Sequence, residues 1–211
     1  ILLIGHRGHV EMEGTMGEAP DTTILIETKD EAEAIALPNP AKTIVLTQTT
    51  LSVDDTKETI AALKRRFPDV QFPPKEDICY ATTNRQGAVK IIAPRVQLFL
   101  MIGAPESSNT MRLVETARNV GVPAYCIERA ANIDPLWLEG VETVGVTAGA
   151  SAPEHLVQEV LVWLQEHGAN SVEEVESIVE HMKFTLPPEL LDKAKASGKA
   201  ETLLAKHTIV R

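Results

Sequence analysis

Histidine and glutamate residues are concentrated just after the first apolar segment of the chain. The segment Ile1–Ile4 is apolar, and the loop Gly5–Thr15 that follows it contains His9 and Glu11. A histidine can donate a hydrogen bond to a phosphate, and a glutamate can carry a proton to a reacting carbon or oxygen. The two histidines, His6 and His9, do not have the i, i+4 spacing of a helical zinc site. Taken alone, a loop of this composition is also typical of a solvated turn.

Cys79 lies where a predicted strand gives way to a helix over residues 81–93. A thiolate near a helix start is stabilised and could act as a nucleophile or a metal ligand. A small buried hydrophobic residue is the other interpretation of this position. Cys126, between Tyr125 and Ile127, is expected to lie in the core. Two cysteines are too few for a disulfide framework, so a reducing cytoplasm is expected.

Three loops rich in hydroxyl and amide side chains follow predicted strands. They are Gln48–Ser52, Ala104–Asn109 and Thr147–Ala152, and each leads into a predicted helix. The start of a helix carries unpaired N–H groups and partial positive charge, which favour an anion. The run Ser107-Ser108-Asn109 is the sharpest example. The alternative is that one of these residues caps the helix and the others are solvated.

Short apolar strands alternate with amphipathic helices along the chain. Strands are predicted at 23–27, 43–47, 96–103, 124–127 and 143–146. Helices are predicted at 30–37, 53–66 and 81–93, from the end of the loop Ala104–Asn109 to about residue 120, and from Pro153 to Gly168. Continuous apolar strands between helices predict an α/β protein of two successive small domains. Each domain would be a mainly parallel sheet flanked by helices.

The domain boundaries are expected near residues 74 and 168. Residues 1–74 would carry the His/Glu and Thr loops, residues 75–168 Cys79 and the Ser/Asn loops, and residues 169–211 an acidic C-terminal extension. Ligands of open α/β sheets bind beyond the carboxyl ends of the strands. The candidate residues are therefore expected around one site.

Composition limits the kinds of partner. The 211 residues include 30 Asp and Glu against 20 Lys and Arg, a net charge of −10, which argues against nucleic-acid binding. No apolar run approaches the roughly 18–20 residues that span a membrane. A small phosphorylated ligand is compatible with this charge, because a few local donors suffice to bind it.

Five ordered segments together resemble one enzyme family, the 4-hydroxy-3-methylbut-2-enyl diphosphate reductases. The first three are similar to the family patterns G-H-x-G-H-x-E-x-E-G-T-x-G, T-Q-T-T-L-S and I-C-x-A-T-x-x-R-Q. In chain order the five segments are Gly5–Gly17, Thr47–Ser52, Ile78–Gln86, Ser107–Asn109 and Gly145–Pro153. The resemblance covers roughly residues 1 to 190.

The resemblance implies a reaction, a cofactor and partners. The family removes the hydroxyl of its diphosphate substrate with two electrons and two protons. The products are isopentenyl and dimethylallyl diphosphate, at the end of the methylerythritol phosphate route to isoprenoids. A [4Fe–4S] cluster carries the electrons, and ferredoxin or flavodoxin is the implied electron donor.

The resemblance also implies roles for individual residues. Cys79 would ligate an iron of the cluster, and Glu11 would be the proton donor, working with Thr49 near the substrate hydroxyl. The substrate, chiefly its diphosphate, would be bound by His9, Ser107, Ser108, Asn109 and Ser151.

The family site also includes an N-terminal third, which carries two more cluster cysteines and two more substrate-binding histidines. A cluster with three thiolate ligands cannot be held by Cys79 alone. The expectation is that this chain corresponds to the C-terminal two-thirds of such a reductase and has little turnover by itself. Glu106 lies where the family often has Asn, and its charge would repel a diphosphate unless it turned away.

Two other functions remain open on the sequence. A phosphosugar isomerase or transferase would use the Ser and Thr loops as a phosphate cradle. It would work without iron and tolerate Cys79→Ser. A non-catalytic phosphate-ligand binding module would keep its affinity after Glu11→Gln and show no redox chemistry.

Overall fold

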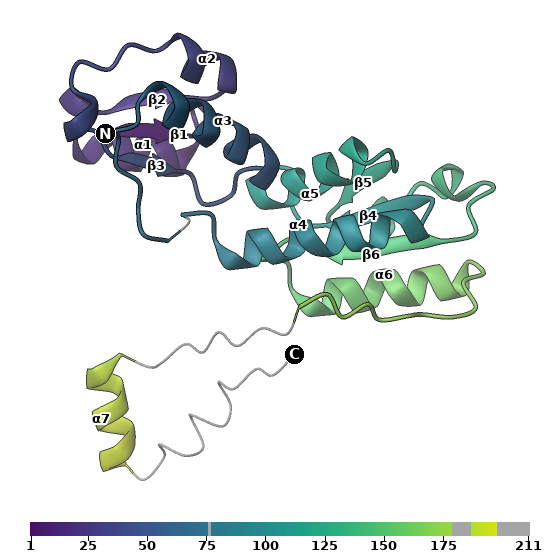
Figure 1. The fold of residues 1–211 in the computed structure, drawn as a ribbon. Helices are drawn as coiled ribbons and strands as arrows, with labels where there is room; N and C mark the ends of the chain where they lie inside the picture. The colour runs from purple at the N-terminus through teal and green to yellow at the C-terminus, as the bar shows by residue number, and fades with distance from the viewer. Residues whose placement is uncertain (76, 179–186, 198–211) are drawn as a thin grey trace. The chain divides into compact units, whose positions relative to one another are not determined.

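The computed structural model describes residues 1–75, 77–178 and 187–197 of the chain (Figure 1). The chain divides into two compact units, Ile1–Val175 and Glu176–Arg211. In the second unit, the described residues form one helix, α7 (Pro188–Ala196). The predicted charged helix or tail from Asp192 onward thus begins inside α7, and the rest of it lies outside the described residues.

The first half of the larger unit, residues 1–75, contains a three-stranded parallel sheet in the order β2-β1-β3. Three α-helices follow the strands in turn. The elements are β1 (Leu2–Ile4), α1 (Val10–Glu18), β2 (Ile24–Ile26), α2 (Lys29–Ala34), β3 (Val45–Thr47) and α3 (Val53–Arg66). Short 3-10 helices lie at Pro20–Thr22 and Pro40–Lys42.

The second half, residues 77–175, repeats this arrangement with a parallel sheet in the order β5-β4-β6. Its elements are α4 (Tyr80–Ile92), β4 (Leu98–Ile102), α5 (Ser108–Asn119), β5 (Ala124–Ile127), β6 (Val144–Ala148) and α6 (Glu154–Glu166). Short 3-10 helices lie at Ala93–Arg95, Ala130–Asn132 and Pro135–Leu138. In both halves the middle strand comes first in the chain.

Helices cover both faces of the second sheet. Every residue of β4 is buried, and alternate side chains point to opposite faces of the sheet. Phe99 and Met101 pack with residues of α4 and α5, whereas Leu98, Leu100 and Ile102 pack with residues of α6. This burial on both faces explains why β4 is a continuous apolar run in the sequence.

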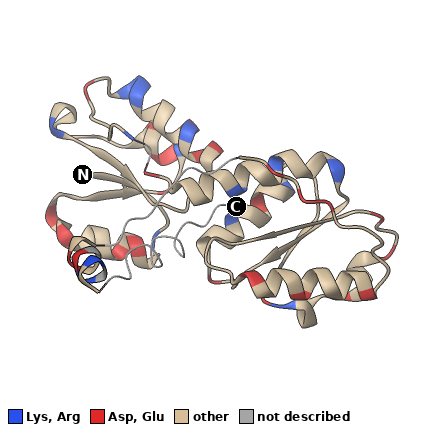
Figure 2. Ribbon diagram, turned by 90° about the horizontal axis from the view of Figure 1, so that it is seen from below, with Lys and Arg blue, Asp and Glu red and all other residues tan. Residues whose placement is uncertain are grey.

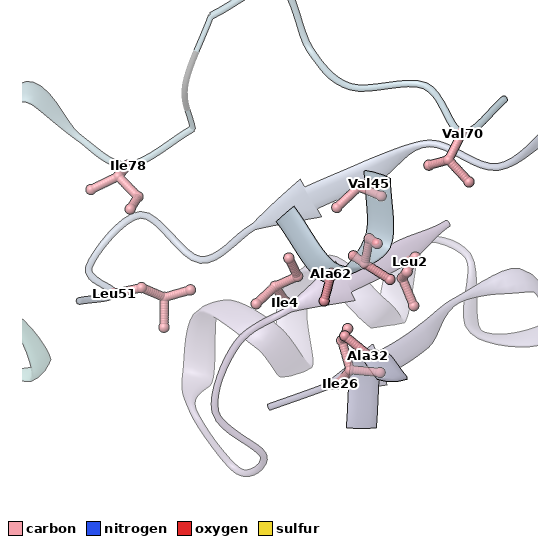
Figure 3. Packing of buried hydrophobic residues seen from close by; sticks show 10 residues of the cluster. Leu2, Ile4, Ile26, Ala32, Val45, Leu51, Ala62, Val70 and Ile78 are labelled. Carbon is pink, nitrogen blue, oxygen red and sulfur yellow. The ribbon is translucent and has the colours of Figure 1, made fainter. Parts of the chain in front are cut away.

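The core of the first half also fixes two segments that carry candidate site residues. Leu2, Ile4 and Val45 of the sheet pack against Ala62 and other side chains of the flanking helices (Figure 3). Leu51, just after the Thr loop, and Ile78, just before Cys79, belong to the same buried cluster. Burying a side chain of this size contributes about 1.5–3 kcal/mol, so both segments are held in place by packing.

The predicted fold class is confirmed: the structure has two parallel α/β sheets flanked by helices. The helix over 53–66 and the strand over 124–127 have the predicted bounds. The expectation of a loop over residues 5–15 is wrong in part, because α1 begins at Val10. Gly14 and Gly17 weaken the helical signal of this segment, while His9 caps the helix and Met12 is buried.

The predicted domain boundaries at residues 74 and 168 stay predictions.

Acidic and basic residues both lie on helices of each half of the larger unit (Figure 2). In the described part of the chain, no helix is both long enough and apolar enough to cross a membrane.

Candidate active site

Glu11 and Thr49 form a close pair at the carboxyl ends of β1 and β3. Glu11 lies in the first turn of α1, and its Oε1 atom accepts a hydrogen bond from the backbone N–H of Thr49 at 2.9 Å. Its Oε2 atom accepts from the Thr49 hydroxyl at 3.0 Å. Two donors on one residue fix the plane of the carboxyl group, which is half-buried. A carboxyl oriented in this way is suited to proton transfer.

His9 is the N-cap residue of α1. Its Nδ1 atom accepts a hydrogen bond from the backbone N–H of Glu11 at 3.3 Å. Since Nδ1 is the acceptor, the proton of a neutral imidazole is carried by Nε2. His9 therefore has an N–H donor to offer a ligand at the start of α1.

Hydrogen bonds join the Thr loop (Gln48–Ser52) of the first half to the Ser loop (Ala104–Asn109) of the second half. The Thr50 hydroxyl donates to Ser108 Oγ at 2.9 Å, and the Gln48 side-chain amide donates to both hydroxyls, at 2.9 Å and 3.3 Å. Some sixty residues separate these loops in the sequence. The carboxyl ends of the two sheets thus meet at these side chains.

Two polar residues on either side of Ser108, Ser107 and Asn109, have different environments. Ser107 is the N-cap of α5, and its Oγ accepts from the backbone N–H of Thr110 at 3.3 Å. Asn109 is 6% exposed, and neither Nδ2 nor Oδ1 has a hydrogen-bond partner among the residues that the structure describes. A buried amide without partners is costly unless a ligand or water satisfies it. Asn109 is therefore well suited to bind a polar ligand.

Cys79 is the N-cap residue of α4 and is exposed. Its backbone N–H donates to the Thr49 carbonyl at 3.0 Å, and its own carbonyl accepts from Thr82 and Thr83. The thiol makes no capping hydrogen bond. The exposed side chain of Cys79 is therefore free of a capping role.

Ser151 follows β6 and is exposed. Gly149, two residues earlier, lies so close to the start of α5 that an added Cβ would be 3.5 Å from Asn109 Nδ2 and 2.3 Å from Thr110 Oγ1. Arg85 of α4 donates from Nε to the carbonyl of Ala148 at 3.1 Å. The backbone that carries Ser151 is thus packed beside the Ser loop. No hydrogen bond of the Ser151 hydroxyl is found in the described part of the chain.

The candidate residues are joined by a chain of contacts. His9 contacts Glu11, Glu11 contacts Thr49, and the backbone of Cys79 is bonded to Thr49. The Thr loop then contacts Ser108, and the Ser loop adjoins the turn before Ser151. Among the described residues, no three His, Cys, Asp or Glu side chains group as ligands of a metal ion. The arrangement combines a proton-transfer group, an accessible thiol and several neutral donors suited to an anion.

His6 borders this chain of contacts. Burial lowers the pKa of His6 below its ordinary value of 6.5, and the positive charge of Arg112 lowers it further. Glu27 and Glu115 act in the opposite direction. His6 Nε2 and Arg112 Nε are both buried, and neither has a hydrogen-bond partner in the described part of the chain. Charge on His6 is thus disfavoured at the edge of the site.

The sequence assigned no role to three polar residues that hold segments around the site, although they lie in the segments Thr47–Ser52 and Ile78–Gln86. Gln48 is fully buried and bonds to both halves. Gln86, 2% exposed, accepts from the Val53 N–H at 3.0 Å and donates to the Leu51 carbonyl at 2.8 Å. Arg85 reaches the end of β6. Their polar types next to apolar runs were the available signal, but burial is not visible in a single sequence.

Fold and site together define an α/β protein with an acid, a thiol and a set of neutral anion donors at the ends of two parallel sheets. Residues 1–165 match the protein family described as LytB protein, so the chain belongs to that family.

Individual relatives agree with this assignment. The chain is 51% identical over 187 residues to the 4-hydroxy-3-methylbut-2-enyl diphosphate reductase of Ralstonia nicotianae, covering 89% of this chain and 58% of that protein. It is 52% identical over 191 residues to the enzyme of the same name from Rhodococcus jostii, covering 90% of this chain and 57% of that protein.

A solved structure has the same fold. The E-1-hydroxy-2-methyl-but-2-enyl-4-diphosphate reductase from Plasmodium falciparum superimposes with a TM-score of 0.80 at 32% identity, covering 94% of this chain and 63% of that one. The chain thus spans somewhat less than two-thirds of the length of the proteins that it matches.

Proposed function

We propose that this chain contributes to the reductive dehydroxylation of 4-hydroxy-3-methylbut-2-enyl diphosphate. The reaction breaks the bond between carbon and the hydroxyl oxygen, consumes two electrons and two protons, and releases water. Its products are isopentenyl and dimethylallyl diphosphate. Membership of the LytB family and the names of the relatives support this proposal.

The observation that carries the proposal is the contact of Glu11 and Cys79 with the same residue, Thr49. Thr49 holds both carboxyl oxygens of Glu11, and its carbonyl accepts from the backbone of Cys79. For the hydroxyl to leave carbon as water, its oxygen needs a proton and the carbon needs electrons. Glu11 is the proposed proton donor, and the Thr49 hydroxyl aligns it with the substrate hydroxyl.

The diphosphate would be bound by neutral donors. His9 offers its Nε2–H, Ser108 its hydroxyl, and Asn109 its buried, unpartnered amide. Ser107 and Ser151 complete the proposed set, Ser107 through the start of α5, which it caps. Neutral donors at a helix N-terminus bind an anion without burying a fixed positive charge.

A [4Fe–4S] cluster is the proposed source of electrons, with Cys79 as one ligand. The exposed thiol of Cys79 fits this role because it is not used for helix capping. Cys126 of β5 does not fit this role, because its half-buried thiol already donates to the Gly103 carbonyl at 3.3 Å. A site of this kind needs further thiolates, which we propose come from sequence outside residues 1–211. Ferredoxin or flavodoxin is the proposed external electron donor.

The test is a fusion that places the N-terminal third of the Ralstonia nicotianae reductase before Ile1. The fusion is reconstituted anaerobically with iron and sulfide, and consumption of the substrate is followed with a chemical reductant. We expect turnover by the fusion, a loss of at least about a hundredfold for Glu11→Gln, and loss of iron binding for Cys79→Ser.

Two further assays of the fusion separate the rival functions. Absence of reduction, together with conversion of a phosphosugar that needs no iron and tolerates Cys79→Ser, would favour a phosphosugar isomerase or transferase. Diphosphate binding without any redox reaction in the fusion would favour a binding module. Full-rate reduction by residues 1–211 alone would contradict the proposed need for outside ligands.

A further inference from the structure

Gln48 is a fully buried polar residue at the carboxyl end of β3. Its backbone N–H donates to the Ile4 carbonyl at 2.8 Å, so the residue continues the ladder between β3 and β1. A buried side-chain amide persists in a core only when its donors and acceptor are satisfied. The partners of Gln48 therefore indicate why an amide stands at this position.

The orientation of the Gln48 amide is fixed by one backbone group. Its Oε1 atom accepts from the backbone N–H of His6 at 3.0 Å. Because a backbone N–H can only donate, the atom facing it has to be the amide oxygen. The NH₂ group therefore faces the hydroxyls of Thr50 and Ser108, at 2.9 Å and 3.3 Å.

With the NH₂ group in this place, the hydroxyls of Thr50 and Ser108 both accept from Gln48. A hydroxyl has one proton and two acceptor positions. Ser108 Oγ accepts from the Gln48 amide and from the Thr50 hydroxyl, so both of its acceptor positions are used. Its own proton has only the Thr50 carbonyl at 3.4 Å, which is long for an O–H···O hydrogen bond. The Ser108 proton is thus available to an anionic oxygen.

We propose that Gln48 is a positioning residue that presets the Ser108 hydroxyl as a donor to the diphosphate. Gln48 also holds the backbone of His6, which leads into the segment of His9 and Glu11. The Gln48 amide thereby fixes the position of Ser108 relative to the segment that carries Glu11, the proposed proton donor. Chains of hydrogen bonds with a common direction reinforce each other. This inference rests on the proposed function, because it takes the anion at Ser108 to be the diphosphate.

The test is a double-mutant cycle on the 211-residue chain with inorganic pyrophosphate as the probe. Gln48→Met keeps the length of the side chain and removes its hydrogen-bonding groups. We expect it to raise the Kd for pyrophosphate about tenfold, as for the loss of one hydrogen bond to a charged group. In the Ser108→Ala background the same change should raise the Kd less than about twofold, because Gln48 acts through Ser108.

Gln86→Met is the matched control. Gln86 is equally buried and also bridges the two halves, through the Val53 N–H and the Leu51 carbonyl. We expect it to lower the Tm as Gln48→Met does, but to leave the Kd for pyrophosphate within about twofold of the unmodified chain. If Gln48→Met does not fold, Gln48→Asn replaces it in the cycle, since it stays neutral and polar but is one methylene too short to span from the His6 N–H to Ser108.

The outcomes separate the inference from the proposed function. A weaker affinity for Gln48→Met that largely vanishes without Ser108 supports the positioning role. An unchanged affinity, or an equal loss in both backgrounds, overturns that role and leaves the diphosphate site standing. Absence of pyrophosphate binding by the unmodified chain, with the fusion also inactive, overturns the proposed function and the inference with it.

Discussion

Gly149→Ala tests whether the turn before Ser151 is packed against the start of α5 as the structure has it. Gly149 does not have a positive φ, so alanine is allowed by the backbone. The added Cβ would lie 2.3 Å from Thr110 Oγ1 and 3.5 Å from Asn109 Nδ2. Thr110 is 1% exposed and its Oγ1 lies equally close to the Cβ position of Gly103, so it has little room to turn. Either Thr110 or the turn has to shift.

The expected cost follows from overpacking. Forcing an extra methyl into a filled core costs about 1–3 kcal/mol. The reduced entropy of the unfolded chain offsets about 0.4–1 kcal/mol of this. The net loss is therefore centred near about 1.3 kcal/mol, which lowers the Tm of a unit of this size by roughly 3–5 °C. Urea unfolding followed by circular dichroism measures the free energy of unfolding directly.

Two further variants check that the clash is the cause. Gly87→Ala, inside α4, has nothing within 4 Å of its added Cβ and should stabilise the chain by about 0.5–1 kcal/mol. Thr110→Ala removes the clashing hydroxyl, so Gly149→Ala should cost clearly less in that background. A neutral or stabilising Gly149→Ala, or an equal cost in both backgrounds, would refute the packing of this turn beside the Ser loop.

Three other changes probe the site and its surroundings. Thr49→Val removes one hydrogen bond to the Glu11 carboxyl and should lower the kcat of the reconstituted fusion about 10- to 100-fold. Thr49→Ser should keep most of the activity. Equal kcat values for the two variants would contradict the Glu11–Thr49 pair. Burial, and then the negative charges of Glu128 and Glu106, raise the pKa of Cys126 above its ordinary 9.0, so the unfolded chain loses this proton first and the free energy of unfolding should fall above about pH 9. Cys126→Ala should show a smaller fall in urea titrations over this range, and an identical fall would rule out Cys126 as its source. Because the pKa of His6 is lowered, the unfolded chain binds its proton at higher pH, and the free energy of unfolding should fall as the pH drops below about 6.5. His6→Gln should lessen this dependence, and an unchanged slope would contradict it.

The periodicity of apolar residues in the sequence was sufficient to predict the fold class and most of the strands and helices. β4 is a run of five apolar residues because both faces of its sheet are covered, and the end of α3 is marked by Phe67-Pro68. The helix α1 was missed because two glycines interrupt it and because its cap is a histidine, an uncommon N-cap residue. Local pattern does not contain the tertiary packing of Met12 that compensates for these residues.

The sequence predicted which residue types form the candidate site better than it predicted which of them contact each other. The polar loops after the strands indicated where ligands bind, and the resemblance implied their roles, which remain proposals. The pairing of Glu11 with Thr49 depends on a contact across 38 residues, and that of Thr50 with Ser108 on one across 58 residues. Such contacts depend on how the two sheets meet. Nothing in the periodicity of either half specifies that arrangement.

The most direct measurement of the central claim is an NMR titration of the 211-residue chain with pyrophosphate, following the backbone amides. The loops around His9, Thr49, Ser108 and Ser151 should shift together and saturate with a single Kd, because they form one site. Shifts that are confined to one loop, or loops that saturate with different Kd values, would contradict a common diphosphate site at the ends of the two sheets.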